Sequence, residues 1–354
     1  HKSKNVAATG RLVRGLIIML ILLELLLMLV VILVAAEVFT NALEHLGEKI
    51  GISEGVTGSL FAAVGTALPE TMVPLLALLA GTSDAKVNEE IGVGAILGAP
   101  LMLSTLSICL MSLSVLRQRG IQGELTPEAS GLDRDLNVFL VAFALAALAL
   151  FIPAGQGQLR IVLAVSLVVI YLGYVWSTLR ASQQLVDEGH GTEAEAPMFL
   201  TRLGLPAGWL AIVLQLALGL GMLVGGAKGF IHGVEGGAQI LGISALLLSL
   251  LIIPVATELP EKVNSILWIR RRKDTMAFGN ITGAMVFQGT LLPAIGIALT
   301  PWNNQPQVLA GVVITFIGAL WLRGCHAWGP LRIWQLWLNG ALYLTYLTLA
   351  LRSS

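Results

Sequence analysis

Two stretches of this sequence decide its fold: Gly65-Thr66-Ala67-Leu68-Pro69-Glu70 and its counterpart Ala256-Thr257-Glu258-Leu259-Pro260-Glu261. Each stretch places a glutamate directly after a proline inside a long apolar segment, and the two copies lie 191 residues apart. The alignment extends beyond the motifs, because Gly51-Ile52-Ser53 matches Gly242-Ile243-Ser244 without a gap. We therefore interpret the chain as one unit used twice, with a glutamate among apolar residues in each copy.

The composition is that of an integral membrane protein. Of the 354 residues, 56% are hydrophobic and only 12% are charged, and the mean hydropathy is +0.84. A soluble fold does not need so much apolar surface, and the apolar runs have the length of helices rather than the alternation of barrel strands. The 21 basic and 21 acidic residues balance, so we expect a lipid bilayer and no nucleic acid as partner. Cys109 and Cys325 provide neither a disulfide framework nor a metal spacing.

Hydropathy predicts ten transmembrane helices, since a helix needs about 20 apolar residues to cross a bilayer. We expect them at 13–46, 54–80, 89–116, 136–152, 159–181, 207–239, 243–269, 275–299, 306–322 and 331–351. A polar stretch separates the fifth helix from the sixth. The prediction is therefore a first five-helix repeat over 1–181, a polar linker over 182–206 and a second five-helix repeat over 207–354.

The odd number of helices in each repeat determines how the repeats lie in the membrane. Two homologous five-helix repeats in one chain must enter the bilayer from opposite sides, which is the inverted-repeat plan of many secondary transporters, with the site at the midplane. Loops after odd-numbered helices hold twelve lysines and arginines, whereas the opposite face holds seven. The positive-inside rule then places both termini outside the cytoplasm. We expect the plasma (inner) membrane rather than an organelle.

The motif glutamates are expected near the middle of the bilayer. Nine residues separate Glu261 from Arg270, which is about 14 Å of helix and close to half of a ~30 Å hydrocarbon core. A proline frees carbonyl groups about one turn upstream. Carboxylate, carbonyl and hydroxyl oxygens together suit a hard cation such as Ca2+. The alternative is a local hydrogen bond in a proline-kinked helix, but the repetition of the motif favours an ion site.

The motif also carries a family resemblance. Thr-x-Leu-Pro-Glu in both halves, each followed by a Gly-x-x-x-Gly helix, resembles the α-repeats of the Ca2+/cation antiporter superfamily, which includes the sodium/calcium exchangers. The following helices match at Gly94-Ala95-Ile96-Leu97-Gly98 and at Gly279-Asn280-Ile281-Thr282-Gly283. The resemblance covers about 37–110 and 228–299 in sequence.

The resemblance implies a site in the centre of the molecule. Glu70 and Glu261 would be the central Ca2+ ligands, and Thr66 and Thr257 would contribute oxygen atoms beside them. No cofactor is implied, because the inorganic cations are transported rather than retained.

The chain departs from the sodium-type exchangers at several positions of this expected site. Those exchangers carry serine after each motif threonine and after the second glycine of the following helix, where this chain has Ala67, Glu258, Ala99 and Ala284. The acidic or amide position four residues further on is Leu103 in the first half and Gln288 in the second. Because Na+-coordinating hydroxyls are missing, we favour H+ over Na+ as counter-ion, with Glu258 and Gln288 as candidates for its site. Alternatively, Glu258 pairs with Lys262, four residues on.

The expected sixth helix carries a glycine at every fourth position, at Gly221, Gly225, Gly229, Gly233 and Gly237. Such a strip lets a neighbouring helix approach closely. It predicts either tight static packing or a smooth face along which a gating helix slides.

The sequence therefore predicts an all-α integral membrane protein that exchanges Ca2+ for H+ or Na+ by alternating access. A cation channel is the alternative, as is an antiporter for another divalent cation such as Mg2+ or Mn2+, because carboxylates alone do not select among hard divalent cations. No His-Glu-x-x-His motif, no paired membrane aspartates and no serine–histidine pairing point to an enzyme. The oligomeric state is not predicted.

Overall fold

A computed structural model describes residues 2–50, 68–80, 84–153, 155–187, 196–242, 244, 246, 249–250, 253–254 and 257–352. Within this described part, six helices are long and apolar enough to cross a membrane. They are Met19–Phe39, Ala85–Ser114, Gly157–Arg180, Trp209–Ile240, Asp274–Leu299 and Pro306–Trp328. Large apolar side chains are exposed along several of them, for example Leu22, Leu172 and Leu210 at 60% or more. A bilayer covers such surfaces, and the chain is a multi-pass integral membrane protein.

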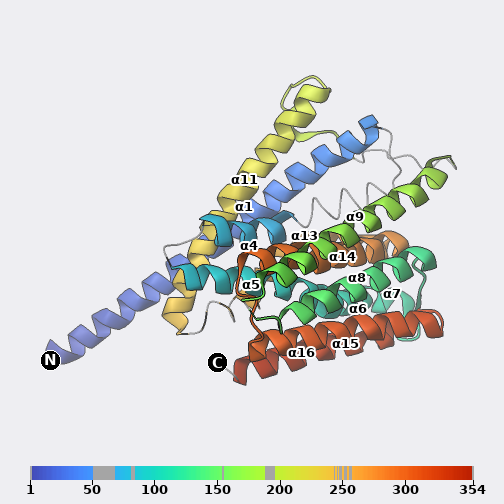
Figure 1. Ribbon diagram of the computed structural model, residues 1–354. Helices are drawn as coiled ribbons and strands as arrows, with labels where there is room; N and C mark the ends of the chain where they lie inside the picture. Colours follow the sequence, from blue (N-terminus) through green and yellow to red (C-terminus); the bar gives the residue numbers. More distant parts are fainter. Residues whose placement is uncertain are drawn as a thin grey trace.

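The described structure is almost entirely helical (Figure 1). In chain order the elements are α1 (Lys2–Ile50), α4 (Leu68–Ala80), α5 (Ala85–Met102), η2 (Leu103–Ser107), α6 (Ile108–Ser114), α7 (Leu116–Arg119), β1 (Glu124–Leu125), α8 (Ala129–Ala149), α9 (Gly157–Asp187), α10 (Phe199–Arg202), α11 (Trp209–Leu241), α13 (Leu259–Arg270), α14 (Asp274–Leu299), α15 (Pro306–Trp328), β2 (Leu331–Arg332), η3 (Ile333–Leu336) and α16 (Trp337–Arg352). The strands β1 and β2 form one short antiparallel pair. Each expected span overlaps one of these helices. Ten crossings in an inverted arrangement, and the division at 182–206, stay predictions.

The long helices α1 and α11 lie side by side and run in opposite directions (Figure 1). Near one end of the contact Gly219 of α11 faces Phe39 of α1, and near the other Gly236 faces Ile21. Between these ends the facing pairs are Gly226 with Ile32, Gly229 with Met28 and Gly233 with Leu25. The glycines therefore bring the backbone of α11 against large side chains of α1.

The contacting glycines differ from the predicted strip. A Cβ at Gly221 or Gly225 would meet no heavy atom of the described chain within 4 Å. Positions spaced by four rotate by about 40° per step around an α-helix, so such a strip leaves the interface within a few turns. The glycines that do face α1, from Gly226 to Gly236, follow a 3-4-3 spacing, which keeps one face toward the neighbour. Close approach was predicted correctly: Gly229 and Gly233 of the predicted strip lie in the contact, whereas Gly221 and Gly225 do not.

A buried polar cluster ties α1 and α11 together at one end. Gln215 Nε2 donates to the carbonyl of Val38 at 2.9 Å and to Asn41 Oδ1 at 2.8 Å. Gln215 Oε1 accepts a hydrogen bond from the backbone N–H of Leu200 in α10 at 3.0 Å. Because Gln215 and Asn41 are both buried, these bonds join the two long helices and α10 into one unit.

Helix α14 is surrounded by other helices, which explains why apolar residues occupy all of its faces. It packs on α8 and α9 as well as on α5 and α13. A Cβ at Gly289 would lie 2.6 Å from the ring of Phe139 in α8, and Phe287 meets the Tyr171 ring of α9 edge-on at 5.6 Å between centroids. Helix α5 is packed in a similar way to α14. It contacts α15, and the η2 turn that follows it contacts α16.

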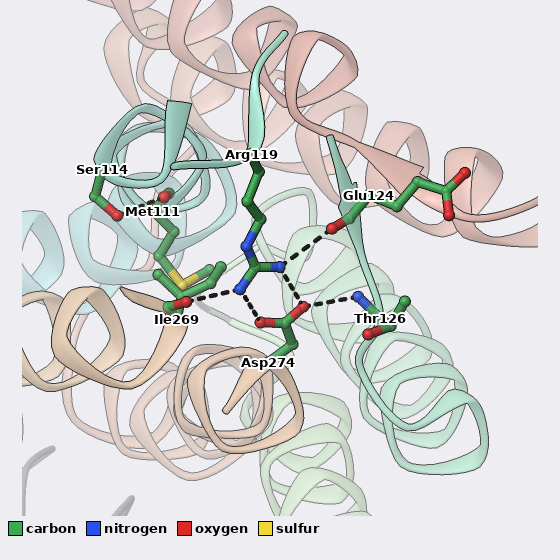
Figure 2. Close-up of polar contacts among 7 residues, drawn as sticks. All are labelled: Met111, Ser114, Arg119, Glu124, Thr126, Ile269 and Asp274. Atoms are coloured by element: carbon green, nitrogen blue, oxygen red, sulfur yellow. Dashed lines mark hydrogen bonds and ion pairs between the residues drawn. The ribbon is translucent and has the colours of Figure 1, made fainter. Parts of the chain in front are cut away.

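The N-terminal end of α14 is fixed by a buried ion pair (Figure 2). Arg119 Nη1 donates to Asp274 Oδ2 at 2.7 Å, and Nη2 donates to Oδ1 at 2.6 Å. The guanidinium also donates to the carbonyls of Ile269 at 2.7 Å and Glu124 at 3.1 Å. The backbone N–H of Thr126 donates to Asp274 at 2.9 Å. The segment between α7 and α8 is thereby joined to the loop between α13 and α14.

The C-terminal end of α14 is held by another buried arginine. Arg160 of α9 donates from Nη2 to the carbonyls of Ile297 at 3.0 Å and Thr300 at 2.6 Å. A cation at a helix C-terminus is favourable because the unpaired carbonyls there carry partial negative charge. Trp302 Nε1 adds a bond to the carbonyl of Ala146 in α8 at 3.0 Å. Residues between 119 and 160 therefore position α14 at both ends.

The helix that begins with α5 widens into the π-helix η2 soon after Pro100. In a π-turn the carbonyls leave the regular hydrogen-bond pattern of the α-helix. Asn339 of α16, which is fully buried, donates from Nδ2 to the carbonyl of Ser104 at 2.7 Å and to that of Gly318 at 3.0 Å. One amide thus joins η2, α15 and α16.

Candidate ion-binding site

Both motif glutamates lie in described helices. Glu70 lies in α4, which is described from Leu68 onward, and Glu261 is the third residue of α13. In the second half Pro260 stands in the first turn of α13, where its missing N–H costs nothing. A single turn residue, Glu258, separates α13 from the helical residues 253–254 and 257. The side chains of Glu70 and Glu261, and all of Thr66, lie outside the described residues, so their convergence stays a prediction.

Thr257 is fully buried directly before the turn that precedes α13. Its Oγ1 donates to the carbonyl of Ile253 at 3.0 Å. Because the single hydroxyl hydrogen is used in this bond, the oxygen lone pairs remain as acceptors. The hydroxyl is therefore oriented in a way that suits a cation ligand.

Glu258 and Lys262 form the ion pair that the sequence offered as an alternative. Lys262 Nζ lies 3.4 Å from Glu258 Oε2, and both residues are buried, with exposed fractions of 5% and 0%. Tyr343 of α16 lies within electrostatic range of the same carboxylate. The lysine balances the charge of Glu258, whose role as a counter-ion site stays a prediction.

Gln288 is a buried amide on α14. Its side chain is fully buried, and neither Oε1 nor Nε2 has a hydrogen-bond partner among the described residues. Leaving such a group unpaired costs about 1–3 kcal/mol, and an ordered water or ion is the usual explanation. Gln288 thus has the property expected of an ion ligand. Among the described side chains no group of three His, Cys, Asp or Glu could hold a metal, and those of Glu70 and Glu261 are not in that set.

The Gly-x-x-x-Gly pattern of α5 brings it against the segment that leads into the second motif. A Cβ at Gly94 would lie 2.9 Å from the carbonyl oxygen of Leu246, and one at Gly98 would lie 2.6 Å from Pro254 Cγ. Ser249, in the same segment, donates to the carbonyl of Glu90 at 3.1 Å. These approaches are possible only without side chains at positions 94 and 98, so both glycines position the backbone before Thr257.

Asn280 of α14 sets the register of α13 against α14. It lies between Gly279 and Gly283, the pair that corresponds to Gly94 and Gly98 of α5. Asn280 Nδ2 donates to Ser265 Oγ at 3.0 Å, and both side chains are buried. Ser265 lies one turn after position 261 on α13. Sequence reasoning did not single out Ser265 or Ser249, although a serine within an apolar run is a signal that could have marked both.

The fold and the site define a helical membrane protein with buried polar groups where a helix is interrupted, as in a transporter. A family model described as sodium/calcium exchanger protein matches residues 20–180 and 211–352. The chain therefore belongs to the sodium/calcium exchanger protein family, whose members are exchangers rather than catalysts.

Individual relatives agree with this placement. CaxA of Alkalimonas amylolytica, a candidate antiporter, is 25% identical over 271 residues, which is 75% of this chain and 76% of CaxA. The inner membrane protein YrbG of Escherichia coli (strain K12) is 25% identical over 280 residues, which is 77% of this chain and 80% of YrbG.

Two kinds of solved structure share the fold. An H+/Ca2+ exchanger, CAX, superposes with a TM-score of 0.72 at 19% identity, covering 94% of this chain and 82% of the other. The sodium–calcium exchanger NCX_Mj superposes with a TM-score of 0.61 at 19% identity, covering 94% of this chain and 99% of the other.

Proposed function

We propose that this protein is a secondary active antiporter that moves Ca2+ in exchange for H+ by alternating access. Glu70 and Glu261 are the proposed central ligands, with Thr66 and Thr257 supplying hydroxyl oxygen and Gln288 an amide oxygen. The two glutamates bind either one Ca2+ or the exchanged monovalent cations, never both sets. A neutralised site can pass through an apolar, occluded intermediate, whereas a charged one cannot.

The observation that carries this proposal is the buried pair of Glu258 and Lys262. With their charges balanced across 3.4 Å, the proposed site retains the two negative charges of Glu70 and Glu261. One Ca2+ or two H+ neutralise two charges. The exchange is therefore electroneutral, and the protons compete for the central glutamates themselves.

The choice of H+ over Na+ rests on the side chains around the site. Ala99 and Ala284 stand where hydroxyl ligands would be needed, and Leu103 stands where an acidic or amide ligand would be. Na+ needs a full set of oxygens to replace its water, whereas a proton needs one basic oxygen. Na+ is the second candidate counter-ion.

The inverted repeat is proposed from the directions in which helices run. Helices α1 and α11, the first helix of each expected repeat, are antiparallel. Helix α5 runs parallel to the segment 246–254, since Gly94 meets Leu246 and Gly98 meets Pro254. If ten helices cross the membrane in alternating directions, the first and sixth run in opposite directions and the third and seventh run in the same direction. The two pairs of segments have these relations, which fit two inverted repeats. The interval between the two parts of the family match, 181–210, contains the proposed linker at 182–206.

The orientation and the membrane are part of the same proposal. Both termini face away from the cytoplasm, because the more basic loops follow the odd-numbered helices. The protein is proposed to reside in a plasma (inner) membrane, as YrbG is named an inner membrane protein.

Uptake of radioactive Ca2+ into proteoliposomes, with outward H+ or Na+ gradients imposed in turn, tests the function. We expect uptake driven by the H+ gradient and unchanged by an imposed membrane potential. Glu70→Gln and Glu261→Gln should each abolish it, whereas Glu124→Gln, at an exposed position in β1, should not. Full uptake in either central variant would refute the site. Uptake without any counter-gradient, together with electrical current, would indicate the channel instead.

A further inference from the structure

A buried carboxyl that is not among the proposed ion ligands lies at the contact of α8 with α14. Asp135 of α8 is only 3% exposed. Its Oδ2 lies 2.7 Å from Thr282 Oγ1 of α14. Its Oδ1 has no hydrogen bond of standard geometry among the described residues, and the hydroxyl of Tyr174 in α9 is a hydrogen-bond donor to this carboxyl. Burial disfavours the ionised form of a carboxyl that is only partly hydrogen-bonded.

Thr282 has two hydrogen-bond partners but one hydrogen to donate. Its Oγ1 lies 2.7 Å from Asp135 Oδ2 and 3.0 Å from the carbonyl oxygen of Phe278. If Asp135 is ionised, the hydroxyl donates to the carboxylate. If Asp135 is protonated, the carboxyl O–H donates to Thr282 Oγ1, and the threonine hydrogen turns to Phe278. The same heavy-atom positions therefore satisfy both protonation states.

Among the described residues, the charged and titratable groups near Asp135 lie on α8 and α9. On α8, Arg134 Nε lies 3.7 Å from Asp135 Oδ1 with its side chain 28% exposed, and Glu128 acts from further away. On α9, Tyr174 lies within electrostatic range, with the Arg134 guanidinium 5.9 Å from its ring centroid. On α14 the neighbour is the neutral Thr282. The charged groups of α15 that reach α8, Arg323 and His326, contact Asp133 instead.

We propose that Asp135 is a proton-binding site, separate from the central ion site, whose ligand is the hydrogen ion itself. The partly exposed Arg134 lies between the carboxyl and the surface, so protons reach it from the end of the molecule that holds Arg119 and Asp274. Proton binding removes a negative charge from the α8–α14 contact without breaking the bond that joins the helices. The proposal does not depend on which ions are exchanged.

Infrared difference spectroscopy of the full chain in lipid vesicles, titrated with acid in the absence of Ca2+, tests this site. The C=O stretch of a protonated carboxylic acid is separate from carboxylate and amide bands. Among the carboxylic acid bands that appear as pH falls, those expected of Glu70 and Glu261 included, we expect one to be lost in Asp135→Asn and retained in Asp84→Asn, where Asp84 is an exposed aspartate that caps α5. Acid-induced difference spectra that are the same in Asp135→Asn and in the unaltered protein would overturn the proposal.

The threonine gives a second test that does not require Asp135 to be changed. Thr282→Val removes the donor to the ionised carboxylate and should shift the midpoint of the band upward by about one to two pH units. Thr282→Ser keeps the hydroxyl and should leave the midpoint in place. Equal midpoints in the two variants would show that Thr282 does not respond to the proton and would refute the assignment, whatever the outcome of the Ca2+ transport assays.

Discussion

Replacing Arg119 with methionine should destabilise the protein strongly. The guanidinium donates two hydrogen bonds to Asp274 and one each to the carbonyls of Ile269 and Glu124. The two side chains are only 8% and 4% exposed. Removing one partner of such a buried pair costs about 3–5 kcal/mol, because the remaining charge stays buried. Asp274 would keep the single bond from the N–H of Thr126.

The double variant Arg119→Met/Asp274→Leu separates the ion pair from simple loss of packing. Because neither charge then remains buried, we expect it to recover most of the lost free energy of unfolding. Arg117→Met is the matched control, since Arg117 is exposed on the same short helix α7, and a change there should stay within about 0.5 kcal/mol. Reversible unfolding in mixed micelles measures all three. Arg119→Met being no less stable than Arg117→Met, or a double variant as unstable as the single one, would refute the reasoning.

Three further predictions concern other contacts. Lys262→Met removes the ammonium 3.4 Å from Glu258 and should cost about 3–5 kcal/mol of unfolding free energy; Glu258→Gln in the same chain should restore most of it, and no restoration would contradict the pair. Gly98→Val should abolish Ca2+ uptake, because its Cβ would lie 2.7 Å from the carbonyl oxygen of Leu250, whereas Gly173→Val, at an open position on α9, should retain it. Glu128→Ala should cost about 1 kcal/mol. Burial alone would raise the pKa of Glu128, but hydrogen bonds from Ser130 and Gly131 and the charge of Arg134 lower it below its usual value. The ionised Glu128 therefore stabilises the fold at pH values above its unfolded-state pKa, and this stabilisation is lost as pH falls through its folded-state pKa. Melting temperatures measured across acidic pH should show this loss in the unaltered protein and not in Glu128→Ala.

Local spacing in the sequence predicted several features correctly. Apolar runs placed the long helices, and the four-residue spacing of Glu258 and Lys262 offered their pairing as one of two alternatives. Both copies of the repeated Leu-Pro-Glu lie in helices, α4 and α13. These features depend on neighbours within one or two turns, which a sequence displays directly.

Contacts between distant segments could not be predicted in this way. Arg119 and Asp274 lie 155 positions apart, and Asp135 and Thr282 lie 147 apart. Helix α8 starts at Ala129, before the expected span at 136–152, because the charged residues Asp133 to Asp135 precede the apolar run that marks a span. The predicted glycine strip of α11 was correct at Gly229 and Gly233 and wrong at Gly221 and Gly225, because the 3.6-residue repeat of the helix decides which face meets α1.

The widened turn at η2 makes the two halves unequal at one aligned position. Leu103 opens the π-helix in the first half, whereas its counterpart Gln288 lies in α14, which continues as a regular helix. In the proposed alternating-access cycle, an exactly symmetric inverted duplication would give the inward-open and outward-open forms the same energy. A π-helix in one half and a polar amide in the other would remove that equality, and the proposed carrier would then prefer one side of the membrane before any ion gradient is applied.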